Sequence, residues 1–279
     1  MEKTNFHTHS TFCDGKASPE AMVQAALEAG LSTLGFSGHS MYPFSSDWHM
    51  AVEDHQAYCQ EVRRLQVQYA DRIRIQLGFE TDYIPGACLP SFARYRSFAP
   101  DFLIGSVHYI GDESSLFAVD NTPEEFSAGI ASVYGGSVEQ AVGAYFSRQR
   151  EMLAKGDFTI AGHLDLVRKY NGRLHLFDEG EDWYKREVEA TARAVAKAGV
   201  IAEINTGGMV RAGLPTPYPG PYFLEKLQEA GVPVTLSSDA HSPEHIAAAF
   251  DQACLYVKKA GYRELAVPEA GSLRFIPLD

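Results

Sequence analysis

The sequence contains few cysteines and no long apolar run. Four cysteines occur in 279 residues, at positions 13, 59, 88 and 254, and no two of them form a Cys-x-x-Cys pair. This sparse spacing argues against both a disulfide framework and a cysteine-based structural zinc site. No run of 18 or more apolar residues is present, and the first residues, MEKTNFHTHS, hold no signal-peptide core. We therefore expect a cytoplasmic protein that does not span a membrane.

Basic residues are also scarce relative to acidic ones. Lys and Arg number 24 against 36 Asp and Glu, which gives a net charge of −12 with neutral histidines. Such a charge repels phosphate backbones and anionic membrane surfaces, so we expect neither nucleic acid nor membrane as a partner. Low-complexity tracts and long linkers are absent. We predict a single domain over residues 1–279, a length that suits one α/β barrel; the oligomeric state is not indicated.

Seven short apolar segments are typical of buried strands. Each is flanked by turn residues and is too short for a helix. Their sequences are TNF (4–6), STLGFSG (32–38), RIRIQLGF (72–79), DFLIGSV (101–107), DFTIAG (157–162), VIAEI (200–204) and VPVTLSS (232–238). Because these segments are apolar throughout rather than alternating, both faces of the predicted sheet are expected to be covered.

Helical patterns separate most of these strands. They are SPEAMVQAALEAG (18–30), DHQAYCQEVRRLQVQY (54–69), EDWYKREVEATARAVAKAG (181–199), PYFLEKLQEAG (221–231) and SPEHIAAAF (242–250). In the first and last of them a serine, Ser18 or Ser242, precedes a proline, which is the pattern of an N-cap followed by proline at the first helical position. Alternation of strand and helix predicts a parallel sheet, and we favour a closed or nearly closed β/α barrel over an open sheet.

Ionisable side chains follow the predicted strands at their ends. A β/α barrel gathers the C-terminal ends of its strands at one mouth, so residues far apart in sequence are expected to meet there. Imidazole nitrogen and carboxylate oxygen suit divalent zinc, manganese and iron. The pattern therefore predicts a metal site formed by His7, His9, His39, Glu80, His108, His163, Asp239 and His241.

Other residues near the strand ends have alternative roles. Asp14 is either a turn former before Gly15 or, because it is close to His7 and His9, a further ligand. His49 and His245 are candidates to line the mouth. The remaining histidines, His55 and His175, are expected to be solvated.

Seven sequence segments together resemble the motif series of the PHP (polymerase and histidinol phosphatase) superfamily. In chain order they are NFHTHSTFCDG, FSGHS, LGFETDY, IGSVHY, AGHLDLVRKY, AEINTGG and LSSDAHSP. The resemblance extends over nearly the whole chain and is strongest to the histidinol-phosphate phosphatases of that superfamily. It implies a distorted (β/α)7 TIM-like barrel with a metal site at the C-terminal ends of the strands. That site would hold three divalent ions: zinc, manganese, iron or a mixture.

The resemblance also implies roles for individual residues. Two arginines in predicted mouth loops, Arg168 and Arg211, would bind substrate phosphate, and Glu80 and Asp239 would join them as catalytic residues. The implied ligand sets are His7, His9, Glu80 and Asp239 on one ion; Glu80, His108 and His163 on a second; and Asp14, His39 and His241 on a third.

The activity implied by the resemblance is hydrolysis of a small phosphomonoester. A metal-activated hydroxide would attack phosphorus, arginines would bind the phosphoryl oxygens, and histidinol phosphate would yield histidinol and phosphate in histidine biosynthesis. The alternatives are a PHP phosphoesterase for another small phosphate or a nucleotide end, and a non-catalytic PHP scaffold. The proton donor to the leaving group stays open between a metal-bound water, His49 and His245. A rim for the cationic substrate is hypothesised from Trp48, Tyr83, Tyr109 and Glu203.

Overall fold

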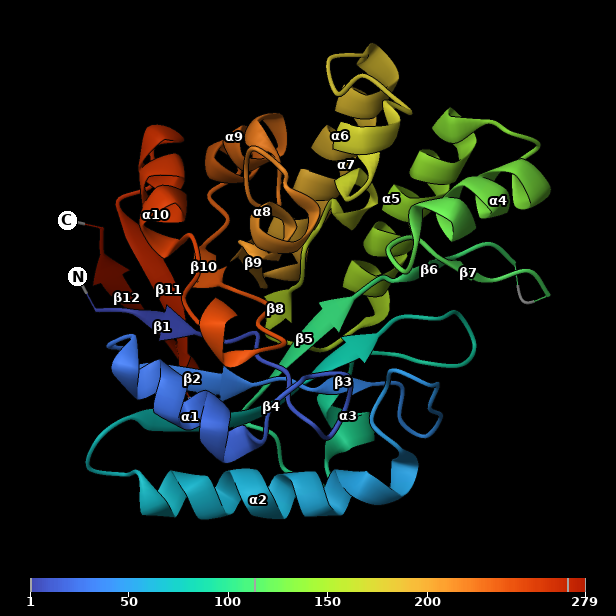
Figure 1. Cartoon of the computed structure of the whole chain (residues 1–279). Helices are drawn as coiled ribbons and strands as arrows, with labels where there is room; N and C mark the ends of the chain where they lie inside the picture. The colour runs from blue at the N-terminus through green and yellow to red at the C-terminus, as the bar shows by residue number, and fades with distance from the viewer. Residues whose placement is uncertain (1, 113, 270, 279) are drawn as a thin grey trace.

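Seven parallel strands form the central sheet of the computed structural model, which describes residues 2–112, 114–269 and 271–278. In sheet order the strands are β1 (Thr4–Asn5), β2 (Thr33–Phe36), β4 (Arg74–Asp82), β5 (Phe102–Ser106), β8 (Ile160–Ala161), β9 (Ile201–Asn205) and β10 (Val234–Ser237). A short additional strand, β3 (His39–Ser40), pairs with the end of β4. All seven predicted strands are confirmed, and the architecture is the expected TIM-like α/β barrel (Figure 1).

The barrel is nearly closed by contacts just beyond the ends of β1 and β10. The backbone N–H of His9 donates to the carbonyl of Ala240 at 2.9 Å, and the N–H of Ala240 donates to the carbonyl of His7 at 3.2 Å. Residues more than 230 positions apart in sequence are thereby fixed side by side at the C-terminal end of the barrel.

Helices cover the outside of the sheet (Figure 1). Ser18 caps the first of them as predicted, because its Oγ accepts a hydrogen bond from the N–H of Ala21 at 3.3 Å. The α-helices are α1 (Pro19–Glu28), α2 (His55–Gln68), α3 (Phe92–Tyr95), α4 (Pro123–Val133), α5 (Val138–Lys155), α6 (Asn171–Leu174), α7 (Asp182–Ala198), α8 (Gly207–Ala212), α9 (Pro221–Glu229) and α10 (Phe250–Lys259). Short 3-10 helices are η1 (Val52–Asp54), η2 (Leu166–Arg168) and η3 (Pro243–His245).

The prediction of a helix that starts at Ser242 is wrong. The Ser242 hydroxyl lies 3.2 Å from Nδ1 of His245 instead of capping a helix, and only the 3-10 helix η3 follows it. The chain then adopts a left-handed conformation at Ala249, with φ of 61°, before α10 begins at Phe250. His55 also differs from its prediction, because it is buried with Nε2 2.7 Å from the hydroxyl of Ser40.

Two antiparallel hairpins were not predicted from the sequence. The first, β6 (Tyr109–Ile110) with β7 (Phe117–Ala118), follows β5 at the mouth of the barrel. The second, β11 (Glu264–Glu269) with β12 (Ser272–Pro277), lies at the opposite end from the arrowheads of β2 and β5 in Figure 1. Its side chains complete an apolar cluster inside the barrel, formed by Phe6, Phe102, Ile104, Ile160, Ile201, Ala266, Val267 and Ile276. Among the helices described, none is long and apolar enough to cross a membrane.

The C-terminal hairpin is expected to stabilise the barrel through its buried face. Ile276→Ala removes a side chain that is 4% exposed in this cluster and should lower the free energy of unfolding by about 2–5 kcal/mol. Phe275→Ala, on the opposite face of β12, is the matched control with a smaller expected loss of about 1 kcal/mol. Urea denaturation followed by circular dichroism measures both, and equal losses would contradict this role of the hairpin.

Candidate metal centre

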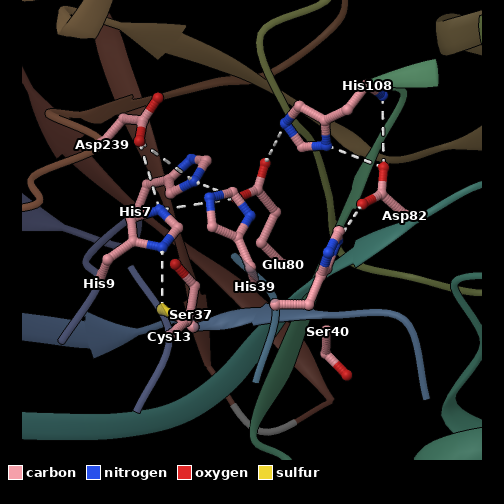
Figure 2. Close-up of polar contacts among 12 residues, drawn as sticks. His7, His9, Cys13, Ser37, His39, Ser40, Glu80, Asp82, His108 and Asp239 are labelled. Carbon is pink, nitrogen blue, oxygen red and sulfur yellow. Dashed lines mark hydrogen bonds and ion pairs between the residues drawn. The ribbon is translucent and has the colours of Figure 1, made fainter. Parts of the chain in front are cut away.

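Glu80 lies at the centre of the barrel mouth, near the end of the long strand β4. Its two carboxylate oxygens face different histidines, of which His7, His39 and His108 are labelled in Figure 2. Oε2 lies 2.9 Å from Nε2 of His7 and 2.8 Å from Nδ1 of His39, whereas Oε1 lies 2.8 Å from Nε2 of His163 and 3.4 Å from Nε2 of His108. Burial opposes ionisation of Glu80, but the surrounding imidazoles hold its pKa well below the usual range. An ionised carboxylate that faces two groups of imidazoles in this way has the geometry of a bridging ligand.

Two further carboxylates complete the ring of donors around Glu80. Asp239 Oδ1 lies 3.3 Å from Nε2 of His9, and Asp14 Oδ2 lies 3.2 Å from Nε2 of His241. The ligand-type atoms form four overlapping groups, each within 4.8 Å: His9, Asp14, His39 and His241; His7, His9 and Asp239; His7, Glu80 and His163; and His39, Glu80 and His108. The structure thus brings together all nine residues that the sequence predicts as candidate ligands.

The chemistry of these donors fits divalent cations. His9 Nε2 and His39 Nδ1 are buried. Carboxylate oxygens of Asp239 and Glu80 lie near them, but within the described part of the chain neither nitrogen has a partner in hydrogen-bond geometry. Buried polar atoms without partners are costly, and a cation bound there would satisfy them. Burial, together with neighbouring His241 and His39, also lowers the pKa of His9 well below its ordinary value, which favours the neutral imidazole that coordinates metal.

Two further carboxylates, Asp82 and Glu203, contact histidine rings on the side away from Glu80. Their role in orienting these rings was not predicted from the sequence. Asp82 Oδ1 lies 2.8 Å from Nδ1 of His108 (Figure 2), and Glu203 Oε1 lies 2.6 Å from Nδ1 of His7. These contacts leave each Nε2 directed at Glu80. Glu203 is fully buried, so its predicted place on the substrate rim is wrong. A signal was present in the sequence, because Asp82 lies two residues after Glu80 and therefore on the same face of β4.

Above the candidate ligands opens a cavity of about 520 Å³. Besides candidate ligands, it is lined by Lys16, Trp48, Ala118, Asp120, Asn121, Leu166, Lys169, Val210, Arg211, Ser242 and His245. Arg211 reaches the cavity as predicted: Nη2 donates to Asp239 Oδ2 at 2.7 Å, and Nη1 donates to the Asp239 carbonyl. His245 also lines the cavity, whereas His49 lies behind His108, with Nε2 2.5 Å from Asp82 Oδ2.

The structure does not bring Arg168 into this cavity, contrary to the prediction. Its side chain is 4% exposed, Nε donates to Glu179 Oε1 at 2.8 Å, and Nη1 lies 3.6 Å from Asp165 Oδ2. The next residue, Lys169, enters the cavity instead and donates through Nζ to the Asp120 carbonyl at 2.7 Å. The reason is local, because successive side chains around the 3-10 helix η2 point in different directions.

The predicted aromatic rim is only partly formed. Trp48 lines the cavity, and its ring packs against the edge of His39 with centroids 4.6 Å apart. Tyr109 stacks on Trp48 with a centroid distance of 5.9 Å. Tyr83 is 2% exposed and is not among the described residues that line the cavity. One aromatic face, that of Trp48, is therefore available to a bound ligand.

Known proteins that resemble this chain in sequence and in fold include histidinol-phosphatases. Residues 5–207 match the family described as PHP domain. A probable histidinol-phosphatase of Deinococcus radiodurans is 31% identical over 260 residues, 92% of this chain and 93% of the relative, and one of Schizosaccharomyces pombe is 28% identical over 95% of this chain and 89% of the relative. The fold matches the crystal structure of Lactococcus lactis histidinol phosphate phosphatase complexed with zinc, L-histidinol and phosphate. The TM-score is 0.75 and the identity 24%, over 98% of this chain and 99% of that one.

Asp82 is expected to support metal binding without itself being a ligand. Asp82→Asn keeps the shape of the side chain but removes its negative charge, which weakens its contacts with the rings of His108 and His49. The affinity for zinc should therefore fall by roughly 10–100-fold. Titration of the metal-free protein with zinc against a competing chelator measures this change. Asp251→Asn, at a side chain that is 89% exposed, is the control, and equal affinities in the two variants would rule out the supporting role.

Proposed function

The chain belongs to the PHP family, and on that premise we propose that it is a metal-dependent phosphomonoesterase that hydrolyses histidinol phosphate to histidinol and phosphate in histidine biosynthesis. One observation carries the proposal: nine ligand-type side chains converge beneath a cavity that is also lined by Lys16, Lys169 and Arg211. Such a site combines bound cations with fixed positive side chains, which is what a phosphoryl group requires.

We propose three divalent ions in this site. Zinc is supported by the histidine-rich donors and by the zinc in the L. lactis relative, and manganese or iron suits the same donors. When bound, such ions lower the pKa of a coordinated water and neutralise phosphoryl charge. The proposed ligand sets are His7, His9, Glu80 and Asp239; Glu80, His108 and His163; and Asp14, His39 and His241.

The side chains of the cavity wall have a separate task in this proposal. Arg211, Lys169 and Lys16 bind the non-bridging phosphoryl oxygens, and Arg211 in addition holds the Asp239 carboxylate in place. We also propose that residues 1–279 act as one barrel domain. The support is the C-terminal hairpin, whose Val267 and Ile276 belong to the apolar cluster inside the barrel.

The activity is tested by phosphate release from histidinol phosphate, with metal content determined on the same sample. We expect close to three ions per chain, loss of turnover with a chelator and recovery when metal returns. His108→Ala should lose both metal and activity, because it removes one imidazole from Glu80 Oε1. Bound metal with an even rate across unrelated phosphomonoesters would contradict the substrate, and a protein that takes up no metal would favour a scaffold.

Arg168, the last residue of η2, and Lys169, which follows it, are expected to have different roles. Lys169→Met should weaken inhibition by inorganic phosphate roughly tenfold, because it removes a cation from the cavity. Arg168→Met should instead lower the free energy of unfolding by about 3–5 kcal/mol, because it leaves buried Asp165 without its cation. Phosphate inhibition and urea denaturation of both variants separate the two roles. The reverse pattern would show that Arg168 is the phosphate-binding residue.

A further inference from the structure

One carboxylate in the cavity lies outside the candidate metal-ligand groups. Three carboxylates line the cavity within the described ranges, and two of them, Asp14 and Asp239, belong to the proposed ligand sets. The third, Asp120, follows β7 and lies in the wall of the cavity beside Asn121 and Lys169. A carboxylate next to a phosphate site repels a phosphomonoester, so binding of such an ester there depends on the cations that face Asp120.

Asp120 is held firmly in this position. Its backbone carbonyl accepts hydrogen bonds from Lys169 Nζ at 2.7 Å and from the Tyr170 hydroxyl at 2.6 Å, and its Oδ2 lies 3.1 Å from Lys169 Nζ. Among the described residues no hydrogen bond involves Oδ1 of this carboxylate. The side chain is 22% exposed, so a ligand in the cavity can reach it.

Asp120 has two possible cationic partners: Lys169 and a cation on the bound ligand. When the Lys169 ammonium turns toward a phosphoryl group, it gives up part of its contact with Asp120 Oδ2. Loss of the cation beside a largely buried carboxylate costs free energy, unless the ligand brings a cation of its own. In histidinol phosphate the ammonium is separated from phosphorus by one oxygen and two carbon atoms, so it can face a carboxylate that adjoins the phosphate site.

We propose that Asp120 determines specificity by accepting the ammonium group of an amino-substituted phosphomonoester, the substrate class to which histidinol phosphate belongs. The proposal rests on the phosphatase function above. Charges then alternate along the bound substrate, from cations to phosphoryl group to ammonium to Asp120. An ester of the same shape without the amino group leaves the carboxylate unpaired and is rejected for that reason.

The test compares two substrates on the zinc-loaded enzyme: histidinol phosphate, and the phosphate ester of 3-(imidazol-4-yl)propan-1-ol, which lacks only the amino group. The unmodified protein should prefer histidinol phosphate in kcat/KM. Asp120→Asn should lower kcat/KM for histidinol phosphate roughly 10–100-fold and leave the amine-free ester nearly unchanged. Asp120→Glu, which keeps the charge, should retain the preference. Asn121→Ala, which alters the same wall without a change of charge, should retain it as well.

Each outcome separates this inference from the function on which it rests. Equal losses on both substrates in Asp120→Asn would mean that the residue acts only through Lys169, and the inference would be wrong. An unchanged preference in that variant would also overturn it, while turnover by the unmodified protein would leave the function standing. No turnover of histidinol phosphate by the unmodified, metal-loaded protein would overturn both. Asp120→Ser takes the place of Asp120→Asn if the asparagine variant does not fold.

Discussion

The burial of several carboxylates in one barrel mouth is the constraint on which the rest of the structure depends. Glu80, Asp82, Glu203 and Asp239 are all nearly inaccessible to solvent, and unpaired buried charges of this kind would oppose folding. Imidazoles surround them, Arg211 pairs with Asp239, and the closure of the barrel at Ala240 places these groups within contact distance. Compensation of these charges therefore depends on closure of the barrel at the C-terminal ends of its strands.

Compensation in the metal-free protein is carried by protons, which couples metal binding to pH. Burial disfavours charge on His108, yet Asp82 and Glu80 raise its pKa to about 10, and Glu203, Glu80 and Asp239 likewise raise the pKa of His7 despite its burial. A cation that binds at Nε2 must displace such protons, so metal binding releases them and weakens as pH falls. Because Asp82 and Glu203 contact Nδ1 of these rings, the nitrogen that faces Glu80 is already set by the protein.

Much of the fold and the candidate ligand set could be predicted because both are encoded locally. A buried parallel strand is a short apolar run, and a residue at its end reaches the mouth whatever lies between the strands. Successive side chains around a 3-10 helix point in different directions, and which of them faces the mouth depends on how the helix packs in the barrel. The sequence therefore could not distinguish Arg168 from Lys169. The hairpin of β11 and β12 was missed because its apolar residues gain their partners only in the assembled barrel, where Val267 and Ile276 belong to one apolar cluster with Phe6. Glu203 looked like a rim residue because depth along a strand depends on register, which pairing with β10 fixes.

The charge of the whole chain and the charge of its cavity act in opposite directions. The net charge is −12, whereas the cavity wall holds Lys16, Lys169 and Arg211 beside a centre suited to divalent cations. A small anion can enter the cavity and gain these contacts, but a long polyanion must also approach the acidic remainder of the surface. Electrostatics thus favours a small phosphate ester before any specific contact is made. Selection among such esters must then come from local chemistry in the cavity wall. Asp120 is a wall carboxylate outside the proposed ligand sets, and its negative charge repels the phosphate but attracts a cationic group on the ester.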